Sequence, residues 1–328
     1  MRASRCRWTT SGPDLEDGEP STRGSVAGGV QNLGVKPLTF AVNLRAAASW
    51  AEFQRLIHRA DELGYDAFAA PDHLGAMAPL STLAAAAGVS SRLRLRTYVL
   101  NAGFYNAALL AREIATVDVL SAGRVEVGLG AGHMKSEHDD AGLPWPPLAQ
   151  RVLAMEALAV ALRRRLVDIE HEPRPVQRPV PIMIGAMSSA GLSVAARHAD
   201  VVAFSGLRQA PGAPVGTFQV SSAEQTLERV DLVRRIRGEV GGRPYRSDAL
   251  LQVVALGRDP VGAARDLAAG LPHLEVQQLL DSPFVLLART AEEAAKELLR
   301  RHEAYGFDSF TTHQPHLEAL AQVMAALS

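Results

Sequence analysis

Two adjacent side chains, Asp72 and His73, place a carboxylate beside an imidazole directly after the apolar segment Ala67–Ala70. Imidazole titrates near neutral pH, so His73 could exchange a proton with a substrate beside a hydride carrier. Asp72 could bind a cofactor amide or fix the imidazole. The alternative is structural, with Asp72 capping the next helix and His73 packing in a loop. The residues alone leave both interpretations open.

A glycine-rich segment at residues 128–132 follows another apolar segment and resembles the dinucleotide-binding fingerprint. That fingerprint needs a helix at once and an acidic residue about 20 positions later, at the end of the next strand. Here residues 133–140 are strongly polar, and the later position falls inside a predicted helix. Glycines without a Cβ would instead let a planar ring lie against the backbone. The alternative is a tight turn that requires positive φ.

Residues 185–189 end an apolar segment and open a helical pattern. Free backbone amides and the hydroxyls of Ser188 and Ser189 could hold a phosphate at the positive end of the helix dipole. Either serine could equally be a plain N-cap, and the two roles are compatible.

Histidines and carboxylates also gather where a metal could bind. His133, Glu137 and His138 form one group, and His313 and His316 are three residues apart. Neither has the His-Glu-x-x-His form of a zinc site, so we predict that no metal is bound. The chain also has no Gly-x-Ser-x-Gly elbow and no P-loop lysine motif, which removes the usual evidence for a hydrolase or a nucleoside triphosphatase.

Short apolar segments and amphipathic segments alternate along the chain. We predict strands at residues 38–42, 67–70, 93–100, 125–129, 182–185, 201–204, 250–255 and 309–312. Helices are predicted at residues 49–63, 79–91, 107–120, 149–165, 188–198, 222–239, 259–269, 291–304 and 315–327. Continuous apolar strands separated by helices indicate a parallel sheet buried on both faces, and this number of units is typical of an α/β fold of the (β/α)₈ TIM barrel type. A doubly wound sheet is the main competitor.

In such a barrel, catalytic residues follow the carboxyl ends of the strands. Polar residues or glycine recur there, at Asn43, Asp72-His73, Asn101, residues 130–133, residues 185–189 and Ser205-Gly206. Residues 205–220, rich in Gly, Pro and Ala, are predicted to form a substrate-side loop.

The composition excludes several classes of protein. Of 328 residues, 47% are apolar, and the net charge is −1, so the composition gives no sign of affinity for nucleic acid or an anionic membrane. The one cysteine, Cys6, excludes a disulfide framework and fits a reducing compartment, so we predict a cytoplasmic protein. Residues 1–36 have few large apolar side chains and no signal-peptide core, and are predicted to be a disordered leader or an over-long start. The catalytic barrel is predicted at residues 37–328.

Four segments carry a family resemblance. The run VDVLSAGRVEVGLGAG at residues 117–132 resembles the unit between strands 3 and 4 of the luciferase-like monooxygenase superfamily. YDAFAAPDHLG at residues 65–75 and the segments at residues 180–204 and 281–307 extend the resemblance over nearly everything after residue 37. The chain is most similar to the branch that uses the deazaflavin coenzyme F420. The resemblance implies a single (β/α)₈ barrel that binds a flavin or deazaflavin at its C-terminal face and is often a homodimer.

The resemblance also implies site residues. Asp72 and His73 match an Asp-His that contacts the deazaflavin and serves acid–base catalysis in F420-dependent dehydrogenases. His133 stands where sugar-phosphate-oxidising relatives place a catalytic glutamate; it is the second catalytic candidate, and its presence argues against that substrate. Two other departures from the family are Ala107, where proline is common, and a short stretch at residues 168–179.

The remaining candidates would bind the cofactor, and Asn43 is assigned with them. At the end of strand 3, where relatives often have a non-prolyl cis peptide behind the ring, the matching residues are Val99, Leu100 and Asn101. The backbone wall beside the cofactor is matched by Gly130, Ala131 and Gly132. The phosphate loop is matched by Gly185, Ala186, Met187, Ser188 and Ser189.

We therefore predict an F420-dependent oxidoreductase that transfers a hydride between the deazaflavin and an unidentified organic substrate. One alternative is an FMN-dependent luciferase-like monooxygenase. A second is a barrel that binds flavin or deazaflavin without turnover. The expected partners are a small-molecule substrate and a second copy of the chain, with no nucleic acid and no membrane.

Overall fold

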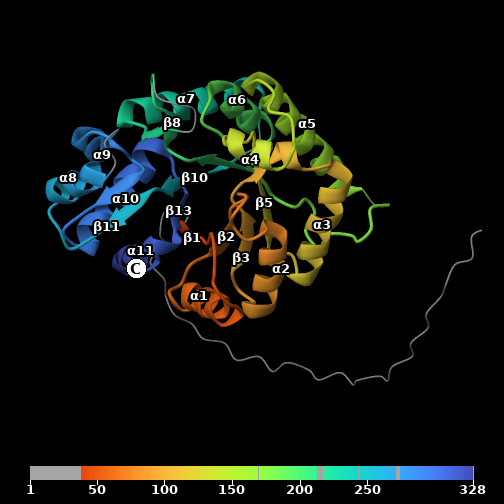
Figure 1. Ribbon diagram of the computed structural model, residues 1–328, viewed down its shortest axis with the longest axis horizontal. Helices are drawn as coiled ribbons and strands as arrows, with labels where there is room; N and C mark the ends of the chain where they lie inside the picture. Colours follow the sequence, from red (N-terminus) through yellow and green to blue (C-terminus); the bar gives the residue numbers. More distant parts are fainter. Residues whose placement is uncertain (1–37, 169, 213–216, 243, 271–273, 328) are drawn as a thin grey trace, which may run out of the picture. The chain divides into compact units, whose positions relative to one another are not determined.

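Eight parallel strand positions close into a barrel in the computed structural model, which describes residues 38–168, 170–212, 217–242, 244–270 and 274–327 (Figure 1). The sheet closes because β3 pairs with both β2 and β5, and β1 pairs with β13. The strands are β1 (Thr39–Asn43), β2 (Ala67–Ala70), β3 (Arg94–Thr97) continued by β4 (Leu100–Asn101), β5 (Val125–Gly130), β6 (Ile182–Gly185), β7 (Val201–Phe204), β10 (Arg246–Leu251) and β13 (Ser309–His313). The predicted (β/α)₈ barrel is confirmed. The predicted leader, residues 1–36, lies outside the described residues.

Helices surround the barrel (Figure 1). Most follow a residue whose side chain caps the first turn, such as Ser49, Asn106 and Thr290. The main ring comprises α1 (Trp50–Glu62), α2 (Pro79–Val89), α3 (Ala107–Leu120), α5 (Leu148–Val167), α6 (Ser189–His198), α7 (Ala223–Glu239), α10 (Ala291–Tyr305) and α11 (Leu317–Leu327). None of the helices in the described ranges has the length and apolar character needed to cross a membrane.

Two strand predictions need correction. The third strand was expected to be continuous from residue 93 to 100, but it divides into β3 and β4 around a cis peptide between Tyr98 and Val99. The seventh was expected at residues 250–255, whereas the barrel strand is β10 (Arg246–Leu251). Its inward positions include Asp248, whose partners are distant in sequence, so an apolar pattern could not reveal the strand.

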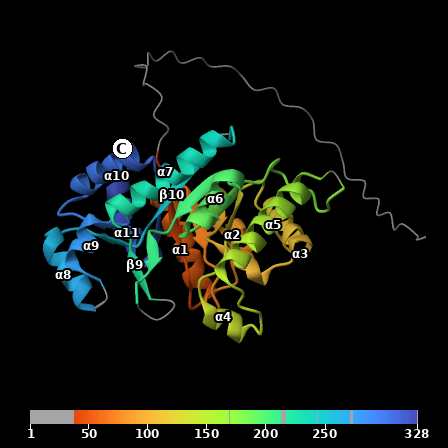
Figure 2. The same cartoon turned by 90° about the horizontal axis from the view of Figure 1, so that it is seen from above.

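Further elements decorate the barrel. The predicted loop at residues 205–220 contains an antiparallel hairpin of β8 (Leu207–Gln209) and β9 (Phe218–Val220). Residues 253–287 contain β11 (Val253–Ala255), α8 (Pro260–Gly270), α9 (Val276–Asp281) and β12 (Val285–Leu287), with β11 paired to β12. The other additions are α4 (Lys135–Asp140) and the short 3₁₀ turns η1 (Ala102–Phe104) and η2 (Gln314–His316). Figure 2 shows α4 and β9 extending beyond the barrel on the same side.

Successive strand residues alternate between the helices and the barrel interior. Outward side chains such as Phe68 and Val127 form the main core with the helices. Mid-strand inward positions hold a buried ionic network, in which Arg96 lies between Glu126 and Asp248 at 2.6 Å and 3.0 Å. The last residues of four strands are instead glycine or polar: Asn43, Gly130, Gly185 and His313. The carboxyl end of the barrel is therefore the end with room and polar groups for a ligand.

Candidate active site

Three ionisable side chains meet at this carboxyl end. His73, in the loop after β2, has its Nδ1 2.7 Å from Oε1 of Glu137 on α4. His133, after β5, lies edge-on to His73 with the ring centroids 5.3 Å apart. On its other side, His133 contacts Phe218 of the hairpin at 5.4 Å. The structure thus brings together both predicted catalytic histidines and adds a carboxylate that the sequence indicated only as a metal candidate.

The contact between Glu137 and His73 fixes which imidazole nitrogen can react. A carboxylate accepts the Nδ1–H, so Nε2 of His73 is the nitrogen left to exchange a proton. Glu137 is 12% exposed and His73 29% exposed, so the pair is largely shielded yet open on one side. The arrangement is that of an oriented general acid–base.

His133 is held neutral by its surroundings. Burial lowers the pKa of His133, and the neighbouring His73 lowers it further. A neutral His133 can accept a hydrogen bond beside His73.

Asp72 makes hydrogen bonds to residues near the end of the third strand. Its Oδ2 accepts a hydrogen bond from the backbone N–H of Asn101 at 2.9 Å, and it also accepts one from the hydroxyl of Tyr105. Burial raises the pKa of Asp72. Asp72 therefore joins the end of β2 to β4, and the carboxylate that orients His73 is Glu137.

Asn101 links this region to α4. Its Oδ1 accepts from Gly103 N at 3.1 Å, and its Nδ2 lies 3.1 Å from Nε2 of His138. His138 Nδ1 donates to the carbonyl of Pro144, so Nε2 accepts from Asn101. His138 is buried against Trp145 and serves packing. In the described part of the chain, no three His, Cys, Asp or Glu side chains are grouped to hold a metal ion.

Val99 covers the inner surface at this end of the barrel. Added Cβ atoms at Gly128, Gly130 and Gly185 would stand 3.0, 2.7 and 3.2 Å from its methyl groups. Gly130 and Gly185 therefore make room for the apolar side chain of Val99, and Gly128 makes room for Val99 and for the carbonyl oxygen of Thr97. Leu100, by contrast, is fully buried in the main core, so only its backbone is available to a ligand.

A side chain at Gly132 is disfavoured for a separate reason. Its φ is +74°, and an added Cβ would lie 2.5 Å from Oδ1 of Asn101. Both the backbone conformation and the close approach favour glycine here. The neighbouring Ala131 packs against the main core, and its carbonyl accepts a hydrogen bond from Arg151 at 3.3 Å.

The ends of β1 and β13 add polar groups that the sequence only partly indicated. Asn43 pairs in register with His313, and its side chain is 7% exposed. Its Oδ1 has no hydrogen-bond donor among the described residues. Such a buried acceptor is costly unless a ligand or water donates to it. His313 lies 3.3 Å from Oε1 of Gln252, and burial, followed by His316, lowers its pKa.

The predicted phosphate loop ends β6 and begins α6. Ser188 is the N-cap and accepts a hydrogen bond from Gly191 N at 3.2 Å, so the plain-cap interpretation holds for this serine. Ser189 is exposed in the first turn. Ala186 and Met187 line a small hollow whose other walls include Leu207, Thr226 and Arg229.

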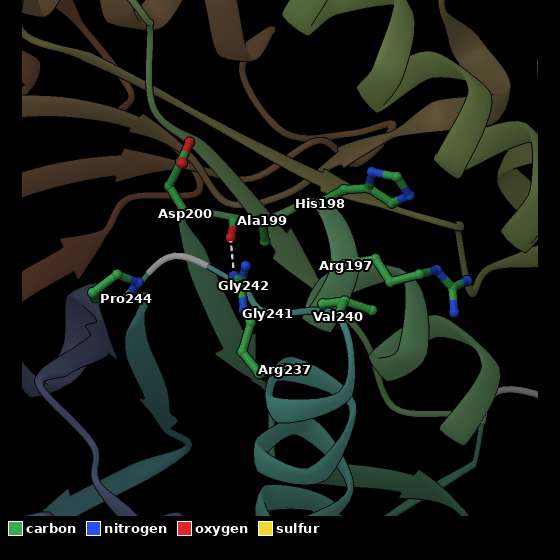
Figure 3. Close-up of a pocket in the computed structure, with 9 residues that line it drawn as sticks. All are labelled: Arg197, His198, Ala199, Asp200, Arg237, Val240, Gly241, Gly242 and Pro244. Atoms are coloured by element: carbon green, nitrogen blue, oxygen red, sulfur yellow. Dashed lines mark hydrogen bonds between the residues drawn. The ribbon is translucent and has the colours of Figure 1, made fainter.

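A separate cavity of about 380 Å³ lies at the opposite end of the barrel, before β7 and β10 (Figure 3). Arg237 donates there to the carbonyl of Ala199, while Arg197 and His198 contact Glu156. No predicted site residue lines this cavity. The amino ends of barrel strands serve stability rather than catalysis, so the candidate active site remains at the carboxyl ends.

Residues 33–216 match the family model described as luciferase-like monooxygenase. The chain belongs to the luciferase-like monooxygenase family. Among its relatives, the F420-dependent glucose-6-phosphate dehydrogenase of Kribbella flavida is 28% identical over 292 residues, covering 78% of this chain and 86% of the relative. The enzyme of the same name from Amycolatopsis mediterranei is 30% identical over 207 residues, covering 55% of this chain and 62% of the relative, so the match spans less than two thirds of that protein.

Solved structures share the barrel fold. An F420-dependent secondary alcohol dehydrogenase in complex with an F420-acetone adduct has a TM-score of 0.71 at 17% identity, covering 89% of this chain and all of that one. The coenzyme F420 dependent tetrahydromethanopterin reductase from Methanopyrus kandleri has a TM-score of 0.69 at 16% identity, with the same coverage. At these identities the likeness shows the fold.

Proposed function

We propose that this protein is an F420-dependent oxidoreductase that transfers a hydride between the deazaflavin and a small organic substrate. The observation that carries the proposal is the His73–Glu137 pair beside His133, at the carboxyl ends of the strands. It gives the barrel an oriented proton donor and acceptor, which hydride transfer to or from a carbonyl, imine or activated alkene requires. The names of the relatives and of two solved structures support F420 as the cofactor.

The site fits a flat cofactor ring. Val99, packed against Gly130, supplies an apolar surface, Asn101 packs against Gly132, and Asn43 offers an unused buried acceptor. The phosphate would lie at residues 185–189, with the exposed hydroxyl of Ser189 and the first turn of α6. When bound, F420 supplies the hydride chemistry at C5 of its ring.

The protein's own residues would manage the proton. Nε2 of His73 exchanges it with the substrate, Glu137 holds the Nδ1–H, and neutral His133 lies beside the pair. Phe218 and the hairpin would close the substrate side. The family resemblance implies that His133 stands where sugar-phosphate-oxidising relatives have a glutamate, so the substrate we propose is a small organic molecule other than a sugar phosphate.

Titration of the purified protein with F420 and with FMN, followed by fluorescence, tests the cofactor. We expect F420 to bind more tightly, because the family relatives named for a cofactor are F420-dependent. Preference for FMN would instead favour the monooxygenase alternative. Tight F420 binding without turnover of any alcohol, aldehyde, imine or enone would favour the non-catalytic barrel.

Gly132→Ala should weaken F420 binding. The new Cβ must displace the Asn101 side chain, which lies at the end of β4 beside the proposed ring. Gly257→Ala is the matched control, because Gly257 has φ +81° with nothing within 4 Å of an added Cβ. Both variants suffer the strain of a left-handed alanine, roughly 1–2 kcal/mol. Equal F420 dissociation constants for the two variants would remove Gly132 from the binding site.

We also propose that the protein is a cytoplasmic homodimer. The single cysteine supports a reducing compartment. The outer face of α5 exposes Leu153 and Val160 with Ala157 between them, an apolar stripe suited to a second copy. Leu153→Glu should convert dimer to monomer in light scattering, whereas Leu299→Glu, at an exposed leucine on α10, should not. A monomeric wild type would contradict the dimer.

A further inference from the structure

Two arginines beside the carboxyl end of β7 form no ion pair with a carboxylate of the described residues. Arg208 on β8 donates to Oε1 of Gln219 at 3.0 Å, and its buried Nε has no acceptor among the described residues. Arg229 on α7 donates to the hydroxyl of Ser221. Gln219 lies on β9, and Ser221 follows directly after that strand. The charge of Arg208 acts on Arg229, so the two guanidinium groups lie near each other.

The two arginines carry like charges, and neither forms an ion pair with a carboxylate of the described residues. Burial lowers the pKa of Arg229, and the charge of Arg208 lowers it further, so the two cations repel each other. Some shielded arginines in the described ranges have carboxylate partners, as Arg96 has Glu126 and Arg301 has Glu297, and others, such as Arg124, donate to several backbone carbonyls. The chain has 35 acidic residues and 34 basic ones, so the absence of an ion pair at these two arginines does not reflect a shortage of acidic residues in the chain. An anion from outside the chain would complete the pair.

The location indicates which anion. Arg229 lines the small hollow that Ala186 and Met187 also line, so the arginine pair borders the loop at residues 185–189. This is the loop to which the proposed function assigns the cofactor phosphate. Beyond its ring, F420 carries a phosphodiester and glutamyl carboxylates, both of which guanidinium groups bind with paired hydrogen bonds.

We propose that Arg208 and Arg229 form an oxyanion site that binds a phosphate or carboxylate group extending from the active site. The proposal of the cofactor side chain as the source rests on the proposed function. The oxyanion site itself rests on the two neighbouring guanidinium groups that form no ion pair within the described residues, and a substrate anion would satisfy the same chemistry.

The test compares F420 with the deazaflavin core that lacks the phosphate and glutamates. In Arg208→Met and Arg229→Met variants, we expect the F420 dissociation constant to rise about 10- to 100-fold, as for loss of charge-assisted hydrogen bonds, and that of the core to stay unchanged. Inorganic phosphate should raise the melting temperature of the wild type but not of the variants. Arg235→Met is the control, since Arg235 is on α7 but exposed and paired with Glu239.

The outcomes distinguish a cofactor anion from a substrate anion and separate failure of the proposed function from failure of the oxyanion site. Loss of the phosphate effect with unchanged F420 affinity would assign the site to a substrate anion. A wild type that binds phosphate through these arginines but does not bind F420 would overturn the proposed function and leave the oxyanion site standing. Equal weakening of F420 and core, or a phosphate effect that survives in both variants, would overturn the oxyanion site.

Discussion

Replacing His73 with alanine is expected to lower turnover by roughly 10²–10⁴-fold while leaving F420 affinity largely intact. The imidazole exchanges the proton that hydride transfer makes necessary, and its orientation is set by the 2.7 Å contact with Glu137. Steady-state rates with a competent substrate, together with fluorescence titration of F420, measure the two quantities separately. A parallel loss of affinity would make His73 a binding residue.

Two companion variants separate orientation from proton transfer. Glu137→Gln retains an acceptor for the Nδ1–H and should lower kcat less than Glu137→Ala, with the melting temperature of both close to the parent. A purely structural Glu137 would lower the melting temperature without this graded loss. If His133→Ala is inactive while His73→Ala turns over like the parent, the proton donor is His133. Full activity of both histidine variants would refute the acid–base mechanism.

The largest effect on stability is expected from Arg96→Met, which should lower the free energy of unfolding by about 3–5 kcal/mol. Arg96 is 2% exposed and lies between the carboxylates of Glu126 and Asp248. Its removal leaves two buried negative charges near each other, and Arg246 contacts only Glu126, at 2.8 Å. Denaturant unfolding at neutral pH measures the loss. Arg59→Met, which removes an exposed pair with Glu318, is the control and should change little.

Lowering the pH should reduce the difference in the free energy of unfolding between the Arg96→Met variant and the parent. Burial alone would raise the pKa of Glu126, but Arg96 and Arg246 hold it below its ordinary value. In the parent, this stabilisation is present above the ordinary carboxyl pKa of about 4.3 and is lost as pH falls through the lower folded-state value. The variant lacks the main cation, so protonation of Glu126 relieves it as the pH falls. A deficit that stays constant from pH 7 to pH 4 would contradict this account.

The barrel could be predicted because its outward-facing strand residues are apolar, as at Phe68 and Val127, and because helices such as α3 begin at a polar cap, Asn106. The seventh strand could not be located from this pattern. Its inward residue Asp248 is stable in the interior only through Tyr98 and Arg96, about 150 residues earlier, and through Ser309 and Thr311. A polar residue whose partners are so distant is typical of a loop in sequence and becomes a barrel residue only after folding.

The residues of the candidate site that follow a strand could be predicted from local sequence, whereas those that depend on distant contacts could not. The rule that chemistry follows strand ends located His73, His133 and Asn43 from local pattern. The contact of Glu137 with His73 was not predicted, because Glu137 lies 64 residues from His73 on a six-residue helix with no amphipathic pattern long enough to detect. The arginine pair escaped because the hairpin that presents Arg208 lies in a stretch rich in Gly, Pro and Ala.

The short helix α4 carries one residue that packs, His138, and one residue that orients His73, Glu137. This arrangement bears on how related barrels can differ in specificity. Six residues cannot hold a helix by backbone hydrogen bonds alone, so α4 depends on His138, fixed by Asn101 and Trp145, to present the adjacent Glu137. The hairpin of β8 and β9 brings Phe218 to His133. His133 contacts both His73 and Phe218, so exchanging the hairpin between homologues should change specificity and the surroundings of His133 together, while the His73–Glu137 pair, after β2 and on α4, stays in place.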